Sequence, residues 1–166
     1  MSNINIAFGI TKDWFQYTCV TICSILSHAN ENNYYKFYIL CSETDANFKN
    51  NYQKLKNISF CNYEFEFIKM NDSDYEGIVH DKRVGISALY RLNLPSLINE
   101  DKVIYLDSDI VVLSDIAELW NIDIKKFLIG AVEDKYSNLM TIQADLSDND
   151  IYFNSGVMLM NLNNFR

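Results

Sequence analysis

Two carboxylates stand between two apolar runs in Ile104-Tyr-Leu-Asp107-Ser-Asp109-Ile-Val-Val112. An apolar run that stops at an acid predicts a buried strand ending near Asp107. Open α/β sheets bind their ligands at the carboxyl ends of such strands. Two like charges this close favour a compensating cation, and carboxylate oxygens suit Mg²⁺ or Mn²⁺, which also bind phosphate. The alternative is that Asp107 and Asp109 are two solvated acids in a turn.

The residues upstream of this segment predict one βαβ unit. Ile4–Phe8 has the composition of a short strand, and apolar residues then recur at helical spacing from Phe15 to about His28. The apolar run Lys36–Cys41 predicts a second buried strand. Strand, helix and strand in this order indicate a parallel pair of strands.

The rest of the chain continues the alternation of helices and strands, which predicts a single α/β domain over residues 1–166. Pro95, the only proline, interrupts a helical segment and could begin a second short helix. The expected elements are a helix in 43–55, a strand within 58–70, a polar loop at 71–76, a helical segment at 86–98, a helical turn at 116–120, a strand at 127–132, a polar loop at 137–150 and a last strand at 156–161. The chain stops soon after that strand, with no terminal helix expected, which suggests a fragment of a longer protein.

The composition indicates a folded, acidic protein. Apolar residues make up 49% of the 166 residues, and the formal net charge is -8. No run of Lys and Arg is present, so nucleic acid is not an expected partner. Neither a signal peptide nor a membrane-spanning run is visible, so we expect a cytoplasmic protein with no transmembrane segment.

The cysteines and histidines carry no metal-binding pattern. None of the four cysteines has the CxxC spacing of a zinc site, and we expect buried, reduced thiols: Cys19, Cys23, Cys41 and Cys61. His28 and His80 lie far apart in the sequence, and we expect both at the surface.

With these motifs taken together, the chain resembles the family 8 retaining glycosyltransferases, the group that includes lipopolysaccharide galactosyltransferases and glycogenin. Several motifs in the family's order carry the resemblance, which spans nearly the whole chain. They are Ile6–Gly9, Tyr17–Leu26, Lys36–Leu40, Asp101–Leu113 with its two acids, Leu119-Trp120, Gly130–Asp134, the Asn-any-Gly strand Tyr152–Leu162, and the aromatic-Arg pair Phe165-Arg166.

The resemblance implies a Rossmann-like GT-A fold, with a mostly parallel central sheet flanked by helices. It implies metal-dependent transfer of a hexose from a UDP-sugar to a glycan or lipid-linked saccharide hydroxyl, with retention of configuration. Asp107 and Asp109 match the residues that hold Mn²⁺ or Mg²⁺. The positions that match the nucleotide-sugar site are Phe8, Gly9, Ile10, Trp14, Arg91, Ser108, Asp134, Asn154 and Ser155.

Each of these roles has a structural alternative. Trp14 could instead cap the first helix, Arg91 could be a solvated helix residue, and Asn154 could be a turn residue. The family often has acids just after its first strand, where this chain has Thr11 and Lys12. The family's further metal-binding histidine and its catalytic carboxylate lie beyond the stretch that these residues match.

Two other functions are compatible with the acidic pair. One is a nucleotide-sugar-binding fragment without turnover. The other is a haloacid-dehalogenase-like phosphatase, in which Asp107 would be the nucleophile and Asp109 the acid/base. The position of the pair in mid-chain, and the lack of a convincing downstream lysine and acidic pair, argue against the phosphatase.

Overall fold

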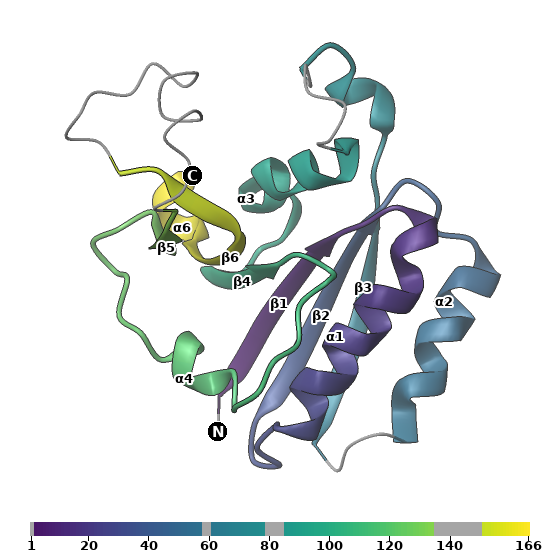
Figure 1. The fold of residues 1–166 in the computed structure, drawn as a ribbon, viewed down its shortest axis with the longest axis horizontal. Helices are drawn as coiled ribbons and strands as arrows, with labels where there is room; N and C mark the ends of the chain where they lie inside the picture. The colour runs from purple at the N-terminus through teal and green to yellow at the C-terminus, as the bar shows by residue number, and fades with distance from the viewer. Residues whose placement is uncertain (1, 58–60, 79–84, 135–150) are drawn as a thin grey trace.

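The computed structural model describes residues 2–57, 61–78, 85–134 and 151–166. Within these ranges a mixed sheet forms the centre of the molecule (Figure 1). Its strands are β1 (Asn3–Gly9), β2 (Tyr34–Cys41), β3 (Asn62–Lys69), β4 (Lys102–Leu106), β5 (Ile129–Glu133) and β6 (Phe153–Asn161), in the order β3-β2-β1-β4-β6-β5. The first four strands are parallel, whereas β6 runs antiparallel to both β4 and β5. The mostly parallel sheet is confirmed.

Helices cover both faces of the sheet. In Figure 1, α1 (Phe15–Ser27) and α2 (Ala46–Gln53) lie side by side over β1, β2 and β3. The opposite face carries η4 (Ile86–Asn93), α3 (Leu94–Leu97) and α6 (Leu162–Phe165). The remaining short helices are η1 (Lys12–Trp14), η2 (Lys54–Asn57), η3 (Asp72–Tyr75) and α4 (Ala117–Trp120). Every described helix is too short or insufficiently apolar to span a lipid bilayer.

Burial on both faces explains the nearly continuous apolar runs of the strands. Alternate residues of one strand enter different clusters: Ile104 and Leu106 pack beneath α1, whereas Val103 and Tyr105 face η4. The same division holds in β1, where Phe8 is fully buried with the first group. The side of β4 on which a residue lies therefore decides whether it can reach η4.

Several expected elements are confirmed with shifted ends. The first helix ends at Ser27, with exposed His28 as its cap, and Pro95 lies in the first turn of α3. Cys41 and Cys61 are buried as expected, but Cys19 and Cys23 are only partly so. The expected loop at 137–150 and His80 lie outside the described residues.

Two expectations are wrong. The segment 71–76 is not only a loop, since η3 forms there and buries Tyr75. The last strand is not the final element, because α6 follows it; Asn161 caps this turn by accepting a hydrogen bond from the Asn164 N–H at 3.1 Å. A single turn of four residues is too short to produce a helical periodicity in the sequence.

Candidate functional site

The candidate site lies where the order of the strands reverses. β1 has β2 on one side and β4 on the other, so the chain departs in opposite directions from this pair. Open α/β sheets bind ligands at this point, beyond the carboxyl ends of the strands. A cavity of about 530 Å³ lies there. Its lining consists of Gly9, Ile10, Thr11, Trp14, Gly85, Ser87, Ala88, Arg91, Tyr105, Asp107, Ser108, Asp109 and Ser155.

Asp107 is held in a fixed orientation through one carboxylate oxygen. Tyr105 donates its hydroxyl to Oδ1 at 3.1 Å, and Arg91 Nη2 lies 3.3 Å from the same oxygen. The Asp107 backbone N–H extends the β4–β6 ladder by donating to the Gly156 carbonyl at 2.8 Å. The side chain of Asp107 is 42% exposed, whereas that of Arg91 is 11% exposed. The carboxylate is therefore both oriented by the protein and open to a ligand.

Gly156 leaves the space that the second carboxylate oxygen occupies. A Cβ atom at this position would lie 2.7 Å from Asp107 Oδ2 and 3.1 Å from Asn154 Oδ1. The strand is irregular here, because the pairing of β5 with β6 shifts between Ala131 and Val132. Such a bulge redirects the backbone and is common beside functional sites. The Asn-any-Gly sequence thus brings the backbone of β6 against the Asp107 carboxylate.

We call residues 107–113, which follow β4, the acidic loop. Side chains of α1 form hydrogen bonds with its backbone. Thr21 Oγ1 lies 2.7 Å from the carbonyl oxygens of Ser108 and Ile110. Ser24 accepts a hydrogen bond from the Val112 N–H at 2.9 Å. These contacts join residues 87 to 89 apart in the sequence. The conformation of the acidic loop, on which Asp109 is exposed, therefore depends on two hydroxyls of a helix.

Arg91 connects three parts of the site. It donates to the carbonyls of Ala88 and Ser155, and it approaches Asp107 as described. Its guanidinium lies over the ring of Tyr105, 4.2 Å from the ring centroid. These contacts use three of the five guanidinium N–H groups, which leaves two without a partner among the described residues. Arg91 is thus a mostly buried cation at the cavity wall rather than a solvated helix residue.

Tyr105 is the main site residue that sequence analysis missed. Its side chain is 1% exposed and its hydroxyl reaches the cavity. Burial raises the pKa of the Tyr105 hydroxyl above its ordinary value of 10.0, so the group stays protonated and donates at neutral pH. Its position two residues before Asp107 was the available signal, since residues i and i+2 of a strand share a face.

The opposite wall of the cavity comes from the segment after β1. Trp14 is 44% exposed and packs against Tyr17 with ring centroids 5.1 Å apart. Gly9 ends β1 where η4 begins to pack against it, and a Cβ there would lie 2.4 Å from the Ser87 carbonyl oxygen. Only glycine allows this close approach. Trp14 precedes α1 but makes no side-chain hydrogen bond as its cap.

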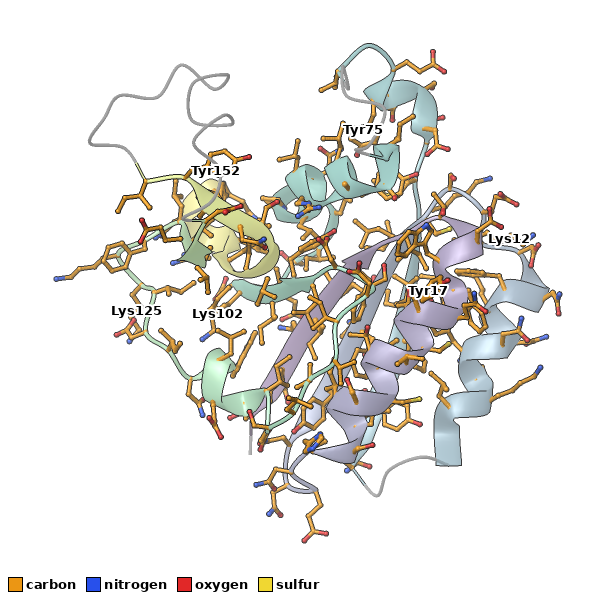
Figure 2. All side chains as sticks on the ribbon, in the orientation of Figure 1. Lys12, Tyr17, Tyr75, Lys102, Lys125 and Tyr152 are labelled. Carbon is orange, nitrogen blue, oxygen red and sulfur yellow. The ribbon has the colours of Figure 1, made fainter. Side chains whose placement is uncertain are left out.

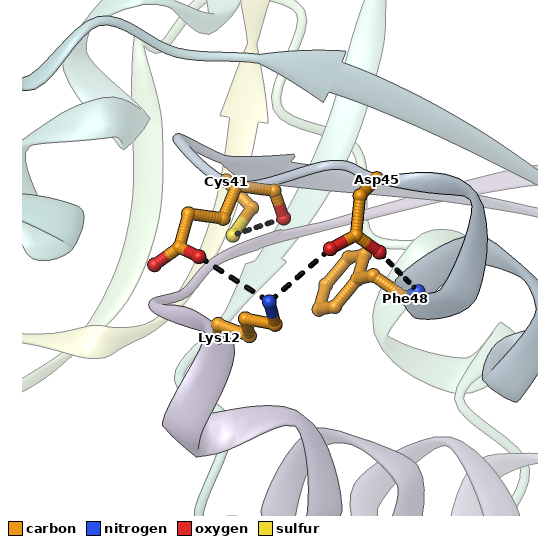
Figure 3. A network of polar contacts seen from close by, with 5 residues as sticks. Lys12, Cys41, Asp45 and Phe48 are labelled. Carbon is orange, nitrogen blue, oxygen red and sulfur yellow. Dashed lines mark hydrogen bonds and ion pairs between the residues drawn. The ribbon is translucent and has the colours of Figure 1, made fainter.

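Lys12, in the segment after β1, forms ion pairs with two acids just before α2 (Figure 3). Its Nζ lies 3.3 Å from Glu43 Oε2 and 3.2 Å from Asp45 Oδ2. Hydrogen bonds to Asp45 and then Glu43 raise the pKa of Lys12. Asp45 in turn caps α2 by accepting from the Phe48 N–H at 2.7 Å. Lys12 is therefore directed into this network and is not part of the cavity lining.

Figure 2 shows Lys12 beside α1 and α2, whereas Lys102 and Lys125 lie toward the other end of the sheet. Lys102 covers the ring of Trp120 at 4.5 Å from its centroid, so this cation has a structural contact of its own.

The structure brings eight of the eleven predicted site residues to one cavity: Gly9, Ile10, Trp14, Arg91, Asp107, Ser108, Asp109 and Ser155. The other three do not line it. Phe8 is fully buried in the core, and Asn154 Oδ1 accepts the Gly156 N–H at 2.8 Å, as a turn residue does. Asp134 follows β5, where its N–H donates to the Tyr152 carbonyl at 2.9 Å.

The residues of the cavity have the chemistry to hold a hard divalent cation. Asp107 and Asp109 supply carboxylate oxygens, which Mg²⁺ and Mn²⁺ prefer. Because Gly156 has no Cβ, Asp107 Oδ2 fits beside the β6 backbone without a clash. Within the ranges that the structure describes, no cluster of three or more His, Cys, Asp or Glu side chains forms a complete metal site. The two carboxylates thus fit as part of a ligand set.

Comparison with known proteins gives one consistent result. The model of glycosyl transferase family 8 matches residues 5–166. General stress protein A of Bacillus subtilis is 29% identical over 148 residues, which cover 86% of this chain and 50% of that protein. A putative glycosyltransferase of Haemophilus influenzae is 29% identical over 168 residues, covering 98% of this chain and 50% of that protein.

A solved galactosyltransferase structure also matches this chain. Galactosyltransferase LgtC, in complex with donor and acceptor sugar analogs, matches this chain with a TM-score of 0.82 and 26% identity. The match covers 100% of this chain and 59% of LgtC. The fold is therefore the GT-A fold of that protein. The chain spans about half the length of the relatives it matches.

Proposed function

Because the chain belongs to glycosyl transferase family 8, we propose that it is the donor-binding part of a hexosyltransferase. The reaction is transfer of a hexose from a UDP-sugar to a hydroxyl of a glycan or lipid-linked saccharide, with retention at the anomeric carbon. One observation carries this proposal: Asp107, Asp109 and Arg91 converge on a single cavity at the β1–β4 switch point. The donor and acceptor sugar analogs bound to LgtC support a reaction between two sugars.

The diphosphate of the donor would lie between the acidic loop and Arg91. Asp107 and Asp109 would hold Mn²⁺ or Mg²⁺, and the cation, when bound, supplies charge neutralisation for the departing diphosphate. The two remaining N–H groups of Arg91 can donate charge-assisted hydrogen bonds to phosphate oxygens. Arg91 does not need to reorganise for this task, because its contacts with Ser155 and Tyr105 already fix the guanidinium.

The nucleoside would occupy the wall formed by Gly9, Ile10 and Trp14. The exposed Trp14 ring offers an apolar face to a base. Thr11 lines the cavity and Lys12 does not, so the contact with the base at this edge falls to Thr11 and not to the lysine. Ser108 would lie near the ribose or phosphate of the donor. Ser155, which also lines the cavity, would lie near the donor sugar.

The protein is also proposed to act in the cytoplasm, which agrees with the partly exposed thiols of Cys19 and Cys23. Residues 1–166 could bind the donor without turning it over, since they span about half of their relatives. The match to the family over residues 5–166 leaves the phosphatase alternative without support.

Calorimetric titration of UDP tests the proposal. We expect wild-type protein to bind UDP with Mn²⁺ far more tightly than with EDTA, and the Asp107→Ala/Asp109→Ala double variant to lose this difference. A control variant, Asp123→Ala, changes an acid outside the cavity and should bind as wild type does. Absence of Mn²⁺-dependent binding in folded wild-type protein, and in a longer version of the chain, would refute the proposal.

A further inference from the structure

The two oxygens of the Asp107 carboxylate have different surroundings. Within the described residues, both side-chain partners of this group meet Oδ1: the Tyr105 hydroxyl at 3.1 Å and Arg91 Nη2 at 3.3 Å. Oδ2 instead lies beside Gly156, at 2.7 Å from the position that a Cβ would take. One oxygen is thus occupied by two donors of the protein, whereas the other packs against Gly156 and has no side-chain partner among the described residues.

Tyr105 is well suited to fix this asymmetry. It lies on β4, between β1 and β6, and is 1% exposed, so its ring has little freedom to move. Its hydroxyl and the Asp107 carboxylate leave the same face of the strand, which makes their contact a property of the backbone. The guanidinium of Arg91 rests on the ring at 4.2 Å from its centroid, so the same residue also orients the second donor.

We propose that Tyr105 is a positioning residue for the cation: its hydroxyl, together with Arg91, occupies Oδ1 of Asp107, so that Oδ2 is the oxygen presented to the metal. This inference rests on the proposed function, because it concerns the same cation. Without the hydroxyl, the Asp107 side chain can rotate between orientations, and only some of them present Oδ2 toward the cavity. Outer-shell partners of metal ligands typically alter metal affinity by about 10- to 100-fold when they are removed.

The test is Tyr105→Phe, which removes the hydroxyl and keeps the ring under Arg91. Tyr38→Phe is the matched control, since Tyr38 is 2% exposed, packs in the same cluster, and donates to Glu100 Oε1 at 3.1 Å away from the cavity. Binding of Mn²⁺ in the presence of UDP is measured from the electron paramagnetic resonance signal of free Mn²⁺. Binding of UDP is measured by calorimetry at low and at saturating Mn²⁺.

We expect Tyr105→Phe to weaken Mn²⁺ binding by about tenfold or more. Saturating Mn²⁺ should restore its affinity for UDP to the value of Tyr38→Phe. A general structural defect would lower UDP affinity at every Mn²⁺ concentration, and that result would overturn the inference. Equal Mn²⁺ affinity in the two variants would overturn it as well. If wild-type protein fails to bind UDP with Mn²⁺, the proposed function fails and the inference falls with it.

Discussion

Replacing Thr21 with valine removes one hydroxyl from the middle of α1 and should loosen the acidic loop. Thr21 is fully buried, and its Oγ1 lies 2.7 Å from the carbonyl oxygens of both Ser108 and Ile110. Valine has nearly the same shape, so the change removes the hydrogen bonds without opening a cavity. We expect lower stability together with weaker binding of UDP and Mn²⁺, because the loop carries both acids of the site.

The size of the effect follows from these contacts. The hydroxyl has one proton and also lies 3.3 Å from the Tyr17 carbonyl within α1, so it satisfies one acceptor at a time. Valine leaves both loop carbonyls, which are the nearer acceptors, without this donor. A buried acceptor without a partner costs about 1–3 kcal/mol. For a chain of this length, 1 kcal/mol corresponds to a change in Tm of about 2–4 °C. We therefore expect Tm to fall by about 2–12 °C, and UDP affinity by about tenfold if ordering of the loop accompanies binding.

Thr18→Val is the matched control. Thr18 is also fully buried in α1, but its hydroxyl donates to the Trp14 carbonyl at 3.0 Å and makes no described contact with the acidic loop. Thermal unfolding followed by circular dichroism and calorimetric titration of UDP with Mn²⁺ measure both variants. If Thr21→Val and Thr18→Val have the same Tm and the same UDP affinity, the reasoning about the loop is refuted.

Three other predictions concern separate parts of the molecule. Gly156→Ala should weaken Mn²⁺-dependent UDP binding by about tenfold, since its Cβ would meet Asp107 Oδ2 at 2.7 Å; Gly130→Ala, whose nearest atom would be 3.5 Å away, should bind normally in the same titration. Burial raises the pKa of Cys19 from 9.0 to about 12. The free energy of unfolding is therefore unaffected by this thiol below pH 9, where it is protonated in both states, and falls as pH rises from 9 toward 12, where only the unfolded chain ionises. Alkylation of Cys19 by iodoacetamide at pH 8 should accordingly be far slower in folded than in urea-unfolded protein, and equal rates would contradict this. A hydrogen bond from the backbone of α2 lowers the pKa of Asp45 below 3.8, so Asp45→Ala should lower Tm at neutral pH. That difference should disappear as pH falls through the folded-state pKa, and a difference that persists in acid would exclude the carboxylate as its cause.

Local sequence patterns predicted most helices and strands and, within the site, the two acids Asp107 and Asp109. Apolar runs predicted the strands, because a strand buried on both faces needs apolar side chains throughout. The periodicity of Phe15, Ile22 and Leu26 predicted α1, which runs from Phe15 to Ser27. The acids Asp107 and Asp109 follow β4 as expected, since the end of an apolar run is itself a local signal.

Other features depend on contacts between distant residues and left no local signal. The antiparallel direction of β6 and the bulge near Gly156 follow from the pairing of strands, which hydrophobicity alone does not specify. Similarly, 3₁₀ geometry at residues 86–93 produces nearly the same pattern of apolar residues as an α-helix.

By itself, the sequence determined that this is an α/β protein with two acids at the end of a strand, because strand, helix and carboxylate signals are local. Only the tertiary structure decided which groups surround those acids. It brings Arg91 and Tyr105 to one oxygen of Asp107 and Thr21 beneath the acidic loop, although Thr21 is 87 residues from Ser108 in the chain. The physical reason is that these contacts arise when η4 and α1 pack on opposite faces of the sheet, and no pattern within one segment records which residues another segment will meet.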